Sequence, residues 1–82
     1  MMEILFFGRL GEQFGRKVEI DPPGESWTVA EIREALCRRS ELFREALSKP
    51  GVRACVDQVM APDHLPVRRG QEVAFIPLLS GG

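Results

Sequence analysis

The start of one amphipathic helix, near the middle of the chain, limits the possible folds more than any other segment. Thr28 and Glu31 have the spacing of a capping box, in which each side chain bonds to the other residue's backbone N–H. Trp27, just before the cap, and Ile32, at the fourth helical position, have the spacing of a hydrophobic staple. The helix is therefore expected to pack through an apolar face that includes Val29, Ile32 and Leu36.

Segments with the pattern of β-strands lie on both sides of this helix. They are rich in β-branched and aromatic residues, and some alternate apolar with polar positions, as strands do. The expected strands are Glu3–Phe7 and Lys17–Ile20 before the helix, and Val52–Val56, a short return at Val59–Met60, and Glu72–Ile76, ended by Pro77, after it. This order of strands and helix predicts an α+β domain.

The connecting segments are expected to be shorter or less regular. Three glycines between residues 8 and 15 are interpreted as turn glycines in a loop or short turn, Arg9–Arg16, because their spacing fits neither the P-loop nor the GxGxxG motif. Ser40 is expected to cap a short second helical segment, Glu41–Ser48. Pro62 and Pro66 predict irregular structure before the last strand.

Length and charge exclude several classes of function. A chain of 82 residues makes one domain, and its net charge of -1, with acids and bases interspersed, argues against a nucleic-acid partner. The sequence has no apolar stretch long enough for a membrane span and no signal-peptide pattern, so we expect a cytoplasmic protein with no membrane contact. Cys37 and Cys55 lack CxxC spacing, which favours free thiols over a disulfide or a metal site.

The first and last strands are apolar on both faces. Leu5 and Phe7 point away from Ile4 and Phe6, and the last strand repeats this pattern. One helix and a short helical segment cover only one face of a sheet in so small a chain. The second face is therefore either left for another protein, which we favour, or covered by a loop.

The sequence contains no recognisable catalytic constellation. Its one histidine, His64, lies in a proline-flanked loop, and neither cysteine has an activating base nearby in the sequence. The carboxylates are scattered, as on a solvated surface. We expect a carrier or a subunit that binds no cofactor and no metal, rather than a free-standing enzyme.

The segment Leu78–Gly82, which ends in Gly81-Gly82, is a candidate functional element. Glycine has no Cβ, so a diglycine can thread a narrow tunnel and present an unhindered α-carboxylate. Five extended residues span at most about 17 Å, which is enough to reach a buried site in another protein. The alternative interpretation is an ordinary frayed terminus.

Several segments together resemble the small subunits of molybdopterin synthase, which belong to the ubiquitin-like sulfur carriers. They are Leu5–Glu12 (LFFGRLGE), Thr28-Val29, Val56–Gln58 (VDQ), Gly70–Pro77 (GQEVAFIP) and Gly81-Gly82. The resemblance implies a β-grasp fold, a mixed sheet packed on one main helix, with the first and last strands parallel and adjacent. It divides the chain into a β-grasp domain, residues 1–77, and a flexible diglycine tail, residues 78–82.

The resemblance also implies a chemistry. Gly82 would be adenylylated by an ATP-dependent activating enzyme, converted to a thiocarboxylate, and used to donate sulfur to a cyclic pyranopterin precursor, forming the molybdopterin dithiolene. The catalytic residues would lie on the large synthase subunit, in an assembly of two small and two large subunits. The residues implied to bind partners are Phe7, Met60, Ile76, Leu78, Leu79, Ser80 and Gly81.

Two alternatives keep the reactive Gly82 but change the fate of its activated carboxylate. The chain could carry sulfur for thiamine or cysteine synthesis, or it could modify proteins by forming an isopeptide bond through Gly82. The chain also departs from the family at Gly8, Gly11, Leu78 and Leu79, where relatives often have other side chains. These differences bear on the first loop and on tail contacts, and leave the diglycine unchanged.

Overall fold

A computed structural model describes residues 1–78, which form a five-stranded sheet, a two-stranded sheet and three helices. The large sheet has the order β2-β1-β7-β4-β5. Its strands are β1 (Met2–Phe6), β2 (Lys17–Ile20), β4 (Val52–Val56), β5 (Val59–Ala61) and β7 (Val73–Pro77). All five strands expected from the sequence are therefore present.

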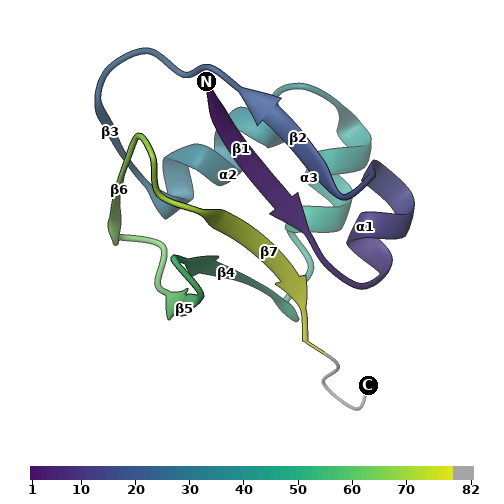
Figure 1. The fold of residues 1–82 in the computed structure, drawn as a ribbon. Coiled ribbons are helices and arrows are strands. Elements are labelled where there is room, and N and C mark those ends of the chain that lie inside the picture. Colours follow the sequence, from purple (N-terminus) through teal and green to yellow (C-terminus); the bar gives the residue numbers. More distant parts are fainter. Residues whose placement is uncertain (79–82) are drawn as a thin grey trace.

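The centre of the sheet is a parallel pair formed by the first and last strands, whose arrows run in the same direction in Figure 1. The register pairs Ile4 with Val73 and Phe6 with Phe75. The other pairs in this sheet, β1–β2, β4–β7 and β4–β5, are antiparallel. The mixed sheet with adjacent parallel first and last strands confirms the expected α+β, β-grasp architecture.

The main helix, α2 (Val29–Cys37), begins as the sequence predicts. The Glu31 amide donates to Thr28 Oγ1 at 3.1 Å, and the Thr28 amide donates to Glu31 Oε1 at 2.8 Å. Trp27 and Ile32 are buried in the same core cluster, as a hydrophobic staple requires. The short helix α3 (Glu41–Leu47) is capped by Ser40, whose Oγ accepts from the Phe43 amide at 3.1 Å. Both predicted helix starts are confirmed.

The segment expected as a loop after the first strand is instead a helix, α1 (Arg9–Phe14). Leu10 and Phe14 are one helical turn apart and pack against the core cluster, with the Phe14 ring stacked on Phe43 at a centroid distance of 4.2 Å. Gly11 lies inside the helix because a Cβ there would be 2.9 Å from the Phe6 carbonyl oxygen. The expectation of a loop was wrong because close packing, not a turn, requires this glycine.

A second difference is the small sheet formed by β3 (Ser26–Thr28) and β6 (Pro66–Arg68), where the prolines predicted irregular structure. Trp27 pairs with Val67 in this sheet, and both side chains are buried. Pro66 is tolerated because the sheet has only two strands, so each strand has one free edge. The small sheet holds the start of α2 against the loop before β6.

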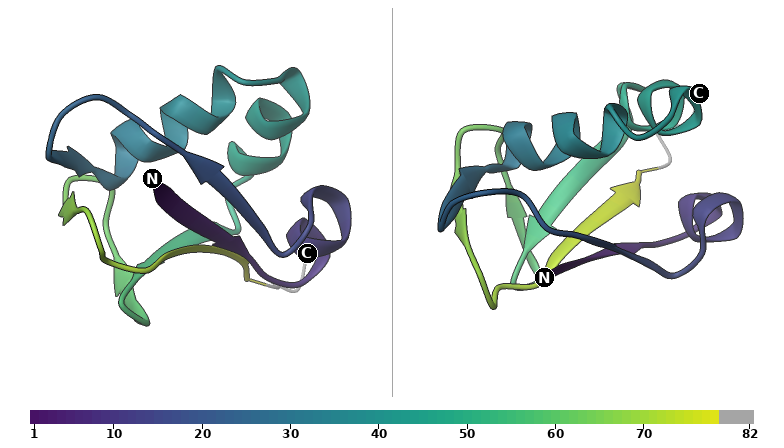
Figure 2. Two further views of the ribbon diagram at one scale, coloured as in Figure 1. Left: turned by 45° about the horizontal axis from the view of Figure 1, so that its top comes forward. Right: turned by 90° about the horizontal axis from the view of Figure 1, so that it is seen from above.

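The core lies between the large sheet and the helices. Figure 2 shows α2 and α3 together on one side of the sheet, which leaves the opposite side without a helix. Ile4, Phe6 and Phe75 point to the helix side and are buried. Within residues 1–78 no helix combines the length and the apolar composition required to cross a membrane.

Candidate functional site

The side of the large sheet that faces away from α2 and α3, called the outer sheet face below, carries an apolar row across four strands. The register pairs Leu5 with Ala74, Ala74 with Cys55, and Cys55 with Met60. Phe7 and Ile76 lie two residues farther along their strands, on the same side. The apolar residues of the outer sheet face are thus Leu5, Phe7, Cys55, Met60, Ala74 and Ile76. Charged residues flank them on the same face, because Arg53 pairs with Ile76 and Lys17 pairs with Leu5.

The centre of this face, Ala74 and Cys55, is shielded from solvent, whereas its rim, Phe7, Met60 and Ile76, is more exposed. Ala74 and Cys55 are only 3% and 8% exposed, although in the described part of the chain no helix covers them. Cys55 Sγ lies 3.4 Å from Met60 Sδ, so the methionine helps to shield the thiol. Met60 is itself 51% exposed and Phe7 is 45% exposed, while Ile76 is half-buried. The large apolar side chains of the rim are therefore available for contact with another molecule.

The base of the C-terminal segment is fixed to the sheet. The Leu78 amide donates a 2.7 Å hydrogen bond to the Gly51 carbonyl oxygen, which continues the β4–β7 ladder one residue beyond Pro77. Leu78 itself is exposed, so its side chain adds an apolar group next to the rim. Gly51 is required here because a Cβ at this position would lie 2.8 Å from the Leu78 carbonyl oxygen.

The contact of Gly51 was not predicted, because a backbone contact between residues 51 and 78 has no local sequence signal. The ladder reaches the first residue of the segment expected as a tail. The other predicted site residues, Leu79, Ser80, Gly81 and Gly82, lie outside the described residues.

A groove of about 320 Å³ adjoins Leu78 on the α1 side. It is lined by Leu10, Pro50, Gly51 and Pro77 among others, and Arg9 and Lys49 stand at its edges as exposed cations. This groove was not predicted, because α1 was expected to be a loop. The periodicity of Leu10 and Phe14 was the signal that could have predicted the helix and therefore the groove.

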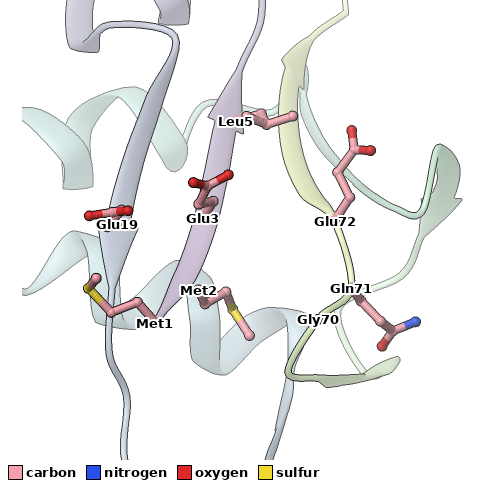
Figure 3. Close-up of a pocket in the computed structure, with 8 residues that line it drawn as sticks. All are labelled: Met1, Met2, Glu3, Leu5, Glu19, Gly70, Gln71 and Glu72. Carbon is pink, nitrogen blue, oxygen red and sulfur yellow. The ribbon is translucent and has the colours of Figure 1, made fainter.

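A second hollow, about 470 Å³, lies at the opposite end of the sheet (Figure 3). It is lined by three carboxylates: Glu3 and Glu19 face each other across β1 and β2, and Glu72 precedes β7. Lys17 pairs with Glu3 at 3.2 Å. Among residues 1–78 no group of three or more His, Cys, Asp or Glu side chains is arranged to hold a metal ion.

Three other titratable residues, Cys37, Asp57 and His64, were considered as candidates for catalysis. Burial raises the pKa of the Cys37 thiol, and Arg44 opposes this shift, so the cysteine is a poor nucleophile near neutral pH. Hydrogen bonds from the Glu72 amide and the Gln71 side chain, both 2.9 Å, lower the pKa of Asp57. His64 is exposed. In the described part of the chain these residues are not assembled into a catalytic set.

Comparison with known proteins decides the family. The family model described as the ThiS family matches residues 4–82, almost the whole chain. The chain belongs to the ThiS family. The solved structure of SAMP1 from Haloferax volcanii is similar to this fold, with a TM-score of 0.81 and 25% sequence identity, and covers 99% of this chain and 98% of that chain. This similarity confirms the ubiquitin-like β-grasp fold.

Two relatives in this family are each named molybdopterin synthase sulfur carrier subunit. The relative from Haemophilus influenzae is 30% identical over 83 residues, and the relative from Escherichia coli is 32% identical over 85 residues. Each alignment covers 100% of this chain and 100% of the relative. The resemblance identified from the sequence segments is therefore confirmed over the full length of the chain.

Proposed function

We propose that this ThiS-family chain is the sulfur carrier subunit of a molybdopterin synthase. The observation that carries the proposal is the full-length similarity, at 30% and 32% identity, to two proteins of that name. A carrier of this kind acts on a larger partner, so the chain would be a non-catalytic small subunit. The large synthase subunit would supply the catalytic residues, and an assembly of two small and two large subunits is the form we propose.

The geometry of the described residues supports this proposal. The central strand β7 leads directly into Leu78, and the exposed rim residues Phe7 and Met60 lie on the outer sheet face of the same sheet. A partner that contacts this face would have the base of the C-terminal segment beside its contact surface. Phe7, Met60 and Ile76 would bind the partner, and residues 78 to 82 would enter its active site.

The proposed chemistry takes place at the carboxylate of Gly82. This carboxylate attacks the α-phosphorus of ATP on the activating enzyme, forming an acyl adenylate and releasing pyrophosphate. Sulfide delivered by a donor then forms a C–S bond and displaces AMP, which leaves a thiocarboxylate. In the synthase, the sulfur attacks a carbon of the pyranopterin precursor and displaces an oxygen substituent from it. Water cleaves the resulting thioester, which restores the carboxylate and leaves a thiol on the precursor, and a second thiocarboxylated carrier repeats the step to supply the second sulfur of the dithiolene. The carrier itself binds no cofactor in this scheme.

The test is the intact mass of the chain after incubation with ATP, the activating enzyme of its own cell and a sulfide source. The proposal expects a gain equal to the replacement of one oxygen by sulfur, absent without ATP and absent when Gly82 is deleted. The deletion should leave the thermal unfolding midpoint unchanged, which separates a lost reactive group from a lost fold. An unchanged mass with an enzyme that activates its usual carrier would contradict the proposal.

Two further readouts distinguish the acceptor. The thiocarboxylated chain, mixed with the large synthase subunit and the pyranopterin precursor, should yield the dithiolene product and return to its original mass. Sulfur transfer only to a thiazole or cysteine precursor would make the chain a carrier for thiamine or cysteine synthesis. Covalent adducts on lysines of other proteins would instead identify it as a protein modifier.

A further inference from the structure

In the described part of the chain, three exposed cations without an ion-pair partner gather at the base of the C-terminal segment. They are Arg9 at the start of α1, Lys49 just after α3, and Arg53 in β4. Within residues 1–78 no carboxylate lies within ion-pair distance of any of them, and even Glu12, three residues after Arg9 in α1, makes no such pair. These three residues are called the basal cations below.

Their surroundings contrast with the rest of the molecule. Lys17, Arg33 and Arg69 are paired with Glu3, Asp63 and Asp21 at distances of 3.2, 2.6 and 3.4 Å. Arg38 and Arg44 share Glu34. Most of the positive charge elsewhere is therefore compensated within the chain, whereas the basal cations leave a local excess in a protein whose net charge is -1.

Two grooves connect the basal cations to one another, and one of them is also lined by Leu78. The groove of about 320 Å³ is lined by Arg9, Lys49 and Leu78. A second groove, about 550 Å³, is lined by Lys49, Arg53 and Ser48, and reaches the Arg33–Asp63 ion pair. Both grooves are lined by Lys49, Pro50 and Val52, at the start of β4. The cations therefore surround the site where the chain leaves the sheet.

The opposite end of the sheet carries the opposite charge. Glu3, Glu19 and Glu72 line the hollow of Figure 3, next to the starts of β1 and β7, whereas Leu78 follows the end of β7. Because β1 and β7 are parallel, the carboxylates and the basal cations lie at the two ends of the same central pair of strands. Glu3 is paired with Lys17, so Glu19 and Glu72 carry the excess negative charge of that end, while the positive end of the central strands lies at Leu78.

We propose that the basal cations recognise carboxylates that surround the opening through which a partner protein receives the C-terminal segment. This inference rests on the proposed function and adds the chemistry of the partner surface. Charges at the rim of an interface accelerate encounter and fix orientation more than they increase affinity. The positive end would turn the C-terminal segment toward the acidic opening before the apolar outer sheet face makes contact.

The test is the rate of association between the carrier and the large synthase subunit of its own cell, measured by stopped-flow fluorescence across a range of salt concentrations. The variants are Arg9→Glu, Lys49→Glu and Arg53→Glu, alone and combined. Arg68→Glu is the matched control, because Arg68 is exposed, has no ion-pair partner among residues 1–78 and lies in β6, outside both grooves. Thermal unfolding of every variant verifies that it is folded.

The combined variant should associate at least about tenfold more slowly than the Arg68→Glu control at low salt, because steering by charge changes association rates by about 10- to 1,000-fold. The difference should shrink near 1 M salt, where the Debye length is only about 3 Å. Lys49→Arg, which keeps the charge, should associate like the unmodified chain.

Three results would overturn the inference in different ways. Equal association rates for the combined variant and the control, with normal thiocarboxylate formation by the unmodified chain, would reject the acidic opening and leave the proposed function intact. Saturable binding of inorganic phosphate at Lys49 and Arg53, followed by NMR, with salt-independent protein association, would assign the cations to a small anion instead. If the unmodified chain neither forms a thiocarboxylate nor binds the large subunit, the proposed function fails and this inference fails with it.

Discussion

The amide of Leu78 donates a 2.7 Å hydrogen bond to the carbonyl oxygen of Gly51, and the two backbones approach so closely that Gly51 has no room for a side chain. This contact joins the end of the last strand to the residue that precedes β4. It fixes the backbone of Leu78, the last residue that the structure describes, against the edge of β4. The position of Leu78 therefore depends on a glycine far away in the sequence.

Gly51→Ala should weaken this junction. The new Cβ would lie 2.8 Å from the Leu78 carbonyl oxygen, so one of the two backbones must shift. Crowding of this kind destabilises by about 1–3 kcal/mol, which thermal unfolding should detect as a lower midpoint. Ser48→Ala, an exposed neighbour whose side chain makes no hydrogen bond in the described part of the chain, is the control. An unchanged midpoint and unchanged amide exchange at Leu78 would show that the contact is not tight.

Phe6 and Phe7 are adjacent in the sequence but should respond differently to substitution. Phe6 is buried and packs against Phe14, Phe43 and Phe75, so Phe6→Ala should cost about 3–5 kcal/mol of unfolding free energy. Phe7 is 45% exposed on the outer sheet face, so Phe7→Ala or Phe7→Asp should change stability little and weaken binding to the large synthase subunit. Denaturant unfolding and calorimetric titration measure the two effects separately. Ile76→Asp should behave as Phe7→Asp does, and unfolding of either aspartate variant with normal binding per folded molecule would assign that residue to the core.

Removal of the helix cap at Thr28 should destabilise the domain without affecting the outer sheet face. Thr28→Ala loses the acceptor for the Glu31 amide, at a cost of about 1 kcal/mol. In a domain of this size such a loss lowers the thermal midpoint by roughly 4–8 °C. Thr28→Ser keeps the hydroxyl and should remain near the unmodified midpoint. Equal losses for alanine and serine would mean that packing of the threonine methyl group, not the cap, is important.

Asp57 should contribute stability that acid removes. Its pKa is lowered by hydrogen bonds from the Glu72 amide and Gln71, so the ionised form is favoured in the folded state. The contribution is fully present above the pKa of an unfolded aspartate, about 3.9, and is lost as the pH falls through the still lower folded pKa. Thermal midpoints of the unmodified chain and Asp57→Asn should therefore differ at pH 7 and converge below about pH 4. Glu25→Gln, at an exposed carboxylate without an ion pair in the described residues, should show no such convergence.

Short sequence patterns predicted the helix caps and strands, because these features depend on residues close together in the sequence. Patterns within a few residues predicted the bonds between Thr28 and Glu31, the Ser40 cap and the five strands of the large sheet. The helix α1 was missed because Gly8, Gly11 and Gly15 suggested turns, although Gly11 is a contact glycine beneath Phe6. The pairing of Trp27 with Val67 and the contact of Gly51 with Leu78 join residues distant in sequence, which no single-segment pattern can reveal.

The outer sheet face of the candidate site could be predicted from the sequence, but the basal cations could not. The two-sided apolar pattern of β1 and β7 correctly indicated a second face without a helix, and the structure places Phe7, Met60 and Ile76 there. Whether they bind a partner stays a prediction. The basal cations were not foreseen, because Arg9, Lys49 and Arg53 come together only through the fold, and a net charge near zero gives no sign of charge separation.

The position of β7 in the middle of the sheet has a consequence for biosynthesis. The ribosome makes β1 and β2 early and β4 and β5 later. Each antiparallel pair has its inner edge open until residues 73 to 77 emerge and fill the gap between the two pairs. Chaperones that recognise open apolar edges would therefore have access to the nascent chain for almost its entire synthesis. A chain cut short before β7 would lack the strand that joins β1 to β4, so its two antiparallel strand pairs could not form one sheet.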